Sequence, residues 1–258
     1  MSLSTFNIQG KTAVVIGGTS GLGRTLALGL ADAGANVVVS ARRKERVDAV
    51  ALEIEAKGRT TLRAVSDVRN RDSLLQLRAA VMATFGHVDI LVNAAGITRK
   101  LATMEVTEED WGEILDTNLT GTLRGCQIFG EPMLKRGSGR VINIASLGSQ
   151  LGLFQVAAYS ASKAGVASLT RSLAVEWSKY GVLVNAILPG VFRTDMNAAL
   201  LEGTERGKEF LMRTPMGRYG KAQELVGAAV FLASDAGTFV TGQLLAVDGG
   251  FLASGVNQ

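Results

Sequence analysis

Short runs of apolar, often β-branched residues alternate with longer helical patterns along the whole chain. Each run ends in glycine, proline or small polar residues, which is typical of strands buried in a parallel sheet. The runs occupy residues 11–16, 35–41, 61–65, 88–92, 140–145, 182–188 and 244–247. This regular alternation predicts one α/β domain over residues 1–258. Residues 192–214 are less periodic and rich in Met, Leu and Arg, and we predict a mobile substrate lid there.

The composition excludes several classes of protein. With 258 residues and 47% apolar content, the chain can bury a large core. No stretch is long and apolar enough for a membrane span, and the first residues lack the basic and apolar regions of a signal peptide. The single cysteine, Cys126, cannot form an internal disulfide, which suits a reducing cytoplasm.

The net charge of +4 comes from basic residues that are spread along the chain rather than clustered. This spread argues against nucleic acid as a partner, while a modest positive field suits an anionic cofactor or substrate. The single histidine, His87, excludes a multi-histidine metal site and lies in a predicted helix-to-strand turn. We therefore predict a small-molecule partner and no bound metal.

A glycine-rich turn follows the first predicted strand and precedes a helical pattern. Strand, glycine turn and helix in that order are the context of a dinucleotide phosphate-binding loop. We expect Gly17 to allow the tight turn, Gly21 to let backbone approach a pyrophosphate, and Gly23 to let the helix pack on the sheet. The helix N-terminus would add free N–H groups and the positive end of its dipole. The predicted cofactor contacts in this turn are Gly17, Thr19, Ser20, Gly21, Leu22 and Gly23.

The second predicted strand ends about twenty residues beyond the glycine turn, where dinucleotide-binding folds select the ribose. NAD-binding folds usually place Asp or Glu there, whereas this chain has Arg42, Arg43 and Lys44. An arginine can pair bidentately with a phosphate, so we predict NADP(H), with Arg42 as the main contact and Arg43 as the second. The alternative is that these cations lie on the exposed face of the next helix, which suits Lys44 best.

Two further strand ends supply candidate cofactor contacts. Asp67, just past the third predicted strand, could reach the adenine edge, cap the next helix, or do both. Small residues after the fourth strand would let the cofactor lie against the strand end. These segments add Asp67, Val68, Asn93, Ala94 and Gly96 to the predicted cofactor-binding residues.

One helical segment carries a pair of residues suited to proton transfer. Tyr159 and Lys163 are four residues apart, so they share one face of the predicted helix. A nearby ammonium favours the phenolate and lowers the phenol pKa from about 10 toward the working range. Ser146 follows the fifth strand, so its hydroxyl could meet the tyrosine over a bound carbonyl. The alternative is a surface Tyr and Lys on an amphipathic helix.

A second helical pattern, over residues 108–130, has Asn118 in its middle. Asparagine is an unfavourable residue in the interior of a helix. A local kink, a water site or a chemical role would each explain its presence there.

Together and in this order, the motifs resemble those of the short-chain dehydrogenase/reductases over nearly the whole chain, residues 11–250. The resemblance rests on the glycine turn, Asn93-Ala94-Ala95-Gly96, Asn118, Ser146, the Tyr159/Lys163 pair, Pro189-Gly190 with Thr194, and Asp248-Gly249-Gly250. It implies a single-domain Rossmann-type α/β fold, a doubly wound sheet of seven parallel strands in the order 3-2-1-4-5-6-7.

The resemblance also implies roles for these residues. Tyr159 would be the acid/base, Ser146 would orient the carbonyl, and Lys163 would hold the nicotinamide ribose while lowering the tyrosine pKa. Asn118 would keep a water-linked proton relay in place. Thr194 would lie near the nicotinamide carboxamide, and the same end of the cofactor would meet Pro189 and Gly190. Members are usually tetramers built on the two long helices that here contain Asn118 and Tyr159, so we expect a homotetramer.

Two positions depart from the family pattern. Ile16 stands where threonine usually precedes the first glycine, and Ala94 stands where a second asparagine is commoner. Both departures remove local hydrogen bonds rather than chemistry. We expect some loss of loop rigidity without loss of activity.

Two groups of relatives give alternative substrates. The residues from Asn93 to Asn118, including Arg99 and Lys100, resemble dehydrogenases of sugar acids such as gluconate, and we favour that substrate class. Either cation could meet a carboxylate or phosphate, or lie in water. Reductases of 3-oxoacyl carrier-protein thioesters often have an arginine where this chain has Val175, although Lys135 and Arg136 remain as possible carrier contacts.

A protein that binds NADP without catalysis, as a sensor or scaffold, is the alternative of another class. Such proteins usually lose the Tyr or the Lys, whereas this chain retains both Tyr159 and Lys163, which argues for an enzyme.

Overall fold

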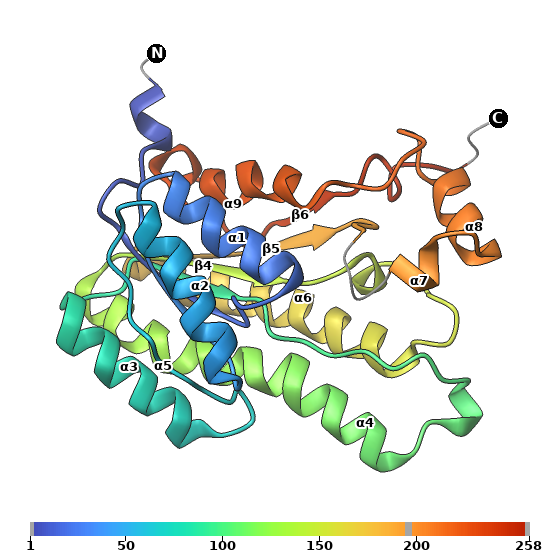
Figure 1. The fold of residues 1–258 in the computed structure, drawn as a ribbon, viewed down its shortest axis with the longest axis horizontal. Helices are drawn as coiled ribbons and strands as arrows, with labels where there is room; N and C mark the ends of the chain where they lie inside the picture. The colour runs from blue at the N-terminus through green and yellow to red at the C-terminus, as the bar shows by residue number, and fades with distance from the viewer. Residues whose placement is uncertain (1–2, 194–197, 256–258) are drawn as a thin grey trace.

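The computed structural model describes residues 3–193 and 198–255, which form a parallel sheet between two layers of helices (Figure 1). The sheet has six strands in the order β2-β1-β3-β4-β5-β6. The strands are β1 (Thr12–Ile16), β2 (Asn36–Ser40), β3 (Ile90–Asn93), β4 (Gly139–Ile144), β5 (Val182–Pro189) and β6 (Leu244–Val247). This order confirms the predicted doubly wound Rossmann-type fold.

Helices connect successive strands, and several short 3-10 turns lie in the loops between these elements. The helices are α1 (Gly21–Asp32), α2 (Lys44–Ala56), α3 (Arg71–Phe85), α4 (Glu108–Leu115), α5 (Gly121–Arg136), α6 (Ala157–Trp177), α7 (Ala198–Leu201), α8 (Glu205–Arg213) and α9 (Val226–Ala233). Figure 1 shows that α7 and α8 lie beyond the end of the sheet toward which β5 points. Within the described ranges, no helix combines the length and the apolar character needed to cross a membrane.

The two faces of the sheet bury alternate residues of each strand. In β1, Ala13 and Val15 pack in one layer with α1, α2 and α9, while Val14 and Ile16 pack in the other with α3, α5 and α6. Figure 1 shows α1 and α9 above the sheet and α3 and α5 below it. Because both faces are covered, every residue of β1 is buried. Burial on both faces explains why the strands appear in the sequence as continuous apolar runs.

The prediction of a strand over residues 61–65 is wrong. The segment runs beside β2 and is joined to its ends by two backbone hydrogen bonds, from Val37 N–H to Thr60 C=O and from Ser66 N–H to Ala41 C=O, both at 3.2 Å. Between these two bonds, a side chain of β2 is hydrogen-bonded to a backbone group of the segment that regular strand pairing would use. Ser40 Oγ donates to Ala64 C=O at 2.8 Å. Local side-chain bonds of this kind compete with regular pairing, so the seventh strand is not formed.

Candidate active site

The glycine turn after β1 brings backbone against backbone. Gly17 has a left-handed backbone, with φ of 83°, and a side chain there would place its Cβ 2.5 Å from the amide nitrogen of Ala95. A Cβ on Gly23 would collide with the Gly17 carbonyl oxygen. Gly21 also has positive φ, but no atom lies within 4 Å of its Cβ position. The turn is therefore closed on the protein side and open at Gly21, where a pyrophosphate would approach.

The start of α1 leaves its first N–H groups available. Ser20 stands at the N-cap position in extended conformation, and its side chain makes no capping hydrogen bond. Thr19 is buried beneath the turn, and Leu22 packs against the core on the α1 side of the sheet. Uncapped N–H groups and the helix dipole favour an anion at this point. These residues therefore fit the phosphates of a dinucleotide.

Two unpaired arginines follow β2. Arg42 and Arg43 are exposed, and neither forms an ion pair with a residue that the structure describes. Lys44, by contrast, pairs with Asp48 one turn later in α2, at 2.5 Å. The helix-face alternative thus holds for Lys44. The two arginines remain free for a phosphate at the end of β2.

Asp67 does not cap the next helix, so that alternative is wrong. The N-cap of α3 is Asn70, whose side chain accepts a hydrogen bond from Ser73 N–H at 3.0 Å. Asp67 instead accepts from Arg69 N–H at 2.9 Å within the preceding turn. Val68, the next residue, is buried against Gly121 of α5. Contact of Asp67 or Val68 with an adenine stays a prediction.

The segment after β3 reaches the centre of the site. The side chain of Asn93 turns inward, where its Nδ2 donates to Asn143 Oδ1 of β4 at 2.9 Å. Because this side chain is engaged within the protein, a cofactor could contact only the backbone groups of Asn93 and the neighbouring Ala94. A Cβ on Gly96 would lie 3.3 Å from Asn118 Oδ1 and 3.5 Å from Lys163 Nζ. The absence of a side chain at Gly96 therefore leaves this corner open beside two of the predicted catalytic residues.

A π-helical turn, Asp116–Thr120, joins α4 to α5 and explains Asn118. The extra residue of the turn interrupts the regular α-helical hydrogen bonding at Asn118, which accounts for an asparagine in the middle of the helical pattern. The buried Asn118 side chain accepts from Ile97 N–H at 2.8 Å and donates to Ile97 C=O at 2.9 Å. It also donates to Ser162 Oγ at 3.0 Å. Asn118 thus ties the loop after β3 to α6. Such π-turns are frequent at functional sites.

Ser146, Tyr159 and Lys163 come together at the carboxyl end of β4. Ser146 follows the strand and is buried, and its hydroxyl is hydrogen-bonded to the Tyr159 phenol. Lys163 is also buried, with Nζ 5.8 Å from the centre of the Tyr159 ring. Its Nζ donates to Ile144 C=O at 2.7 Å. The surface alternative for this pair is therefore wrong.

Burial sets the pKa values of both groups. It raises the pKa of the Tyr159 phenol above its ordinary value, and the hydrogen bond with Ser146 lowers that pKa in part. It lowers the pKa of Lys163 to about 8. The expectation that Lys163 brings the Tyr159 pKa down is wrong for this geometry, because the ammonium is directed at Ile144 C=O and desolvation outweighs other causes.

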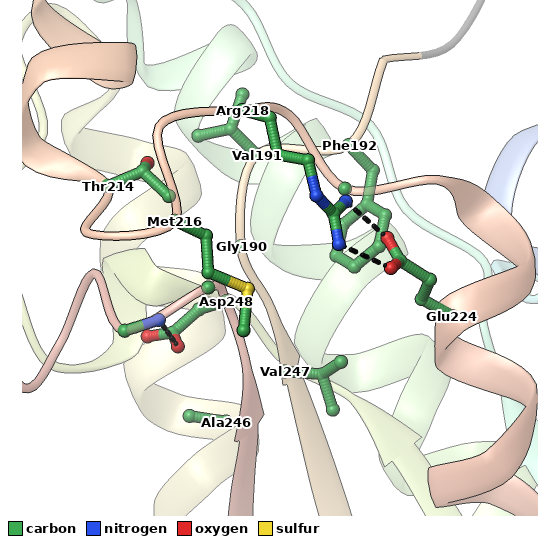
Figure 2. Close-up of a pocket in the computed structure, with 13 residues that line it drawn as sticks. Gly190, Val191, Phe192, Thr214, Met216, Arg218, Glu224, Ala246, Val247 and Asp248 are labelled. Atoms are coloured by element: carbon green, nitrogen blue, oxygen red, sulfur yellow. Dashed lines mark hydrogen bonds and ion pairs between the residues drawn. The ribbon is translucent and has the colours of Figure 1, made fainter.

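Residues near the end of β5 form a neighbouring pocket. Gly190 lies so close to Asp248 that a Cβ there would be 2.5 Å from the Asp248 Cα. Beside it is a pocket of about 310 Å³, in which Arg218 pairs bidentately with Glu224 (Figure 2). The three residues of the candidate centre do not line it. Thr214 belongs to the predicted lid, but sequence reasoning assigned no role to the lining residues 216–220, which lack a periodic signal. Thr194 lies outside the described residues.

A glycine turn closed against backbone, two exposed arginines, and Ser146, Tyr159 and Lys163 brought together at one edge of a doubly wound sheet are typical of an oxidoreductase of the Rossmann class. Residues 17–252 match the model of the family described as Enoyl-(Acyl carrier protein) reductase. The chain belongs to the short-chain dehydrogenase/reductase family. No group of three or more His, Cys, Asp or Glu residues suited to a metal ion occurs in the described ranges.

Several relatives cover almost the entire chain. Gluconate 5-dehydrogenase of Gluconobacter oxydans is 40% identical over 96% of this chain and 97% of its own length. A 3-oxoacyl-[acyl-carrier-protein] reductase of Staphylococcus aureus is 39% identical over 93% of this chain and 97% of its own. The crystal structure of a gluconate 5-dehydrogenase from Burkholderia cenocepacia, in complex with NADP and tartrate, has a TM-score of 0.94 and 38% identity, covering 99% of this chain and 100% of that one.

Proposed function

We propose that this protein is an NADP(H)-dependent oxidoreductase that interconverts a carbonyl and a secondary alcohol on a sugar acid of the gluconate type. The observation that carries the reaction type is the meeting of Ser146, Tyr159 and Lys163 at the carboxyl end of β4, where Lys163 Nζ lies 5.8 Å from the centre of the Tyr159 ring. The free Arg42 and Arg43 support the cofactor, as does NADP in the related Burkholderia structure. The names of the sugar-acid relatives support the substrate class.

The side chains divide the proton chemistry between them. The nicotinamide supplies or accepts the hydride, and the protein handles the proton. Ser146 Oγ accepts from Gly148 N–H at 3.1 Å, which fixes one lone pair; its hydrogen, directed at the Tyr159 phenol in this structure, would turn to the oxygen of a bound substrate. Tyr159 OH gives its proton to that oxygen in reduction and takes it back in oxidation. Burial keeps the phenol protonated until this transfer.

The Lys163 ammonium has unused hydrogen-bond donors that could serve the cofactor. An ammonium carries three donors, and in this structure one of them is used by Ile144 C=O. The remaining donors are available for ribose hydroxyls. A positive charge brought close to Tyr159 by that contact would also favour the phenolate during turnover.

The side chains near the ends of α5 and α6 favour a sugar acid over a carrier-bound thioester. Lys135 is paired with Glu131 at 2.6 Å and Arg136 with Asp89 at 2.8 Å, so both suggested carrier contacts are engaged. Val175 is 80% exposed and offers no cation. A carrier protein is acidic and would need free positive groups on this surface.

The loop after β3 holds the candidate recognition cation. Arg99 is paired with both Asp110 and Glu113 of α4, which neutralises its charge. Lys100 is exposed and forms no ion pair within the described part of the chain. We therefore assign the substrate carboxylate to Lys100 and a loop-anchoring role to Arg99.

Helices α7 and α8 supply the proposed lid. Arg206 of α8 donates to Phe154 C=O at 3.3 Å, which joins α8 to the loop between Ser146 and Tyr159. Phe154 and Met212 are 76% and 70% exposed, so closure of the lid would bury apolar side chains. Residues 192–214 would close over a bound substrate and exclude water.

We also propose a homotetramer in the cytoplasm. Val175 on α6 and Trp111 on α4 are exposed apolar residues on the helices expected at the interface. The single cysteine suits a reducing compartment. Light scattering after gel filtration would give four times the chain mass of 27.0 kDa; a monomer or dimer would contradict the assembly.

The proposed substrate is tested by NADPH oxidation with 5-keto-gluconate and, in parallel, an acetoacetyl thioester. We expect rapid turnover of the keto acid alone. Turnover of the thioester alone would replace the sugar-acid function with fatty-acid or polyester precursor reduction. Binding of NADPH without turnover of either carbonyl would contradict the sugar-acid function and leave the cofactor assignment intact.

The reaction type is tested by Tyr159→Phe. This change removes the acid/base and keeps the ring, so turnover should fall by about a thousandfold while NADPH binding stays within twofold. Steady-state rates and a fluorescence titration with NADPH measure the two quantities. Near-normal turnover would contradict the mechanism.

A further inference from the structure

Ser149 connects the backbones of two residues of the proposed centre. It is the last residue of the 3-10 turn η4 (Leu147–Ser149), which follows Ser146. Its Oγ accepts a hydrogen bond from Ser146 N–H at 3.3 Å and donates one to the backbone C=O of Lys163 at 2.9 Å. A hydroxyl has one hydrogen and two lone pairs, so one serine can make both bonds.

The Ser146 N–H needs such a partner because it lies just beyond the sheet. Ala145 N–H donates to Ile187 C=O at 2.9 Å, which is the last bond from β4 to β5. Ser146 is the next residue, and it is buried. A buried N–H without a partner is rare and costly. By accepting from this N–H, Ser149 determines where the turn stands relative to the strand.

Lys163 is bonded to the chain on both sides of Ser146. Its Nζ donates to Ile144 C=O, two residues before Ser146, and its backbone C=O accepts from Ser149, three residues after. The first bond uses the ammonium, which must also serve the cofactor. The second uses only backbone and Ser149, so it persists when the ammonium changes partner.

We propose that Ser149 is a positioning residue that keeps the Ser146 hydroxyl aligned with Tyr159 by bonding the turn to α6. The inference rests on the proposed oxidoreductase function. In this role Ser149 acts through backbone alone, because its hydrogen and one of its lone pairs are engaged by the Lys163 C=O and the Ser146 N–H. Its loss should therefore lower the rate of the chemical step and leave cofactor affinity alone.

The test compares Ser149→Ala with Ser160→Ala and Ser149→Thr. Ser160 is a matched control, since its Oγ is buried next to Tyr159 yet has no hydrogen-bond partner in the described structure. We expect Ser149→Ala to lower kcat for 5-keto-gluconate about tenfold, the rate equivalent of one ordinary hydrogen bond. The KM for NADPH should stay within twofold. Ser160→Ala should match the wild type, and Ser149→Thr, which keeps the hydroxyl, should restore at least half of the wild-type kcat.

The proposal is overturned if Ser149→Ala stays within twofold of Ser160→Ala, if NADPH affinity falls as much as kcat, or if Ser149→Thr gives no recovery. Assays well below the unfolding temperature of each variant keep loss of fold out of the comparison. Tyr159→Phe, measured in the same assays, distinguishes failure of the proposed function from failure of the positioning role. If that variant is active, the proposed function fails; if it is inactive and Ser149→Ala behaves like wild type, only the positioning role fails.

Discussion

The carboxyl edge of the sheet has two halves that are built in different ways. Near β1 and β2, backbone packs on backbone, and Gly17 and Gly23 leave no room for a single added carbon. The loops that follow β3 and β4 are joined to each other by isolated hydrogen bonds, such as that from Leu101 N–H to Gln155 C=O at 2.8 Å. Gln155 is the one non-glycine residue in the described ranges with a left-handed backbone. The cofactor half is thus rigid, and the substrate half is adjustable.

This difference matches the ligands that the two halves are proposed to bind. A dinucleotide has the same shape in every reaction, so backbone geometry can recognise it. Substrates differ between relatives, and side chains on loops can change without disturbing the sheet. Exposed Phe154 is an example of such a side chain. Substitutions should therefore act on stability and cofactor affinity in one half, and on substrate affinity in the other.

The largest effect should come from the glycine turn. In Gly23→Ala the new methyl meets the Gly17 carbonyl, so we expect a loss of about 3 kcal/mol in the free energy of unfolding. Gly21→Ala meets open space and should cost about 1 kcal/mol for its left-handed backbone, yet it should weaken NADPH binding. Urea unfolding and NADPH titration measure both variants. Equal unfolding free energies would show that the turn is not closed as described.

The next effect concerns the choice of cofactor. Arg42→Asp should lower the preference for NADPH over NADH by about a hundredfold, because a charge-assisted phosphate contact is replaced by repulsion. The measured quantity is the ratio of kcat/KM for the two cofactors. Lys44→Asp is the control, since Lys44 is engaged with Asp48, and it should change the ratio little. An unchanged ratio in Arg42→Asp would remove the arginine from the cofactor site.

A third prediction uses the buried lysine where the two halves meet. The pKa of Lys163 is about 8 in the folded protein and 10.5 ordinarily, so the unfolded chain binds more protons between these values. Stability relative to Lys163→Met should therefore rise with pH across that window, by on the order of 2 kcal/mol between about pH 7 and about pH 9.5. Denaturant unfolding at the two pH values measures it. The exposed Lys135→Met should show almost no such change, and a flat difference for Lys163→Met would mean that the ammonium is not desolvated.

The smallest effect should lie in the substrate half. Lys100→Ala should raise the KM for 5-keto-gluconate about fivefold with kcat unchanged, since an exposed charge contact contributes about 1 kcal/mol. The increase should shrink at high salt, which screens exposed charges. Lys135→Ala, at a cation already paired with Glu131, should leave the KM as it is. If the KM of Lys100→Ala equals that of the wild type, the substrate carboxylate binds elsewhere.

Sequence reasoning located the candidate site where the signal was local. The glycine turn, the arginines after β2 and the Tyr159/Lys163 spacing are each readable within a few residues, because backbone conformation and helical period act at that range. It failed where distant groups compete. The expected strand over residues 61–65 is absent because Ser40, which lies more than twenty residues earlier, takes the carbonyl of Ala64.

The sequence by itself therefore determined the alternation of strands and helices (apart from the absent strand over residues 61–65), the glycine turn after β1 and the types of side chain at the centre. Only the tertiary structure decided how those side chains are solvated and connected. The direction of the Tyr159 pKa is the clearest case, since spacing shows that Lys163 is near and says nothing of burial. The bond from Ser149 to Lys163 C=O is another, because it joins segments that meet only when α6 packs on β4. Desolvation and long-range hydrogen bonds depend on what surrounds a residue in space, which local sequence does not encode.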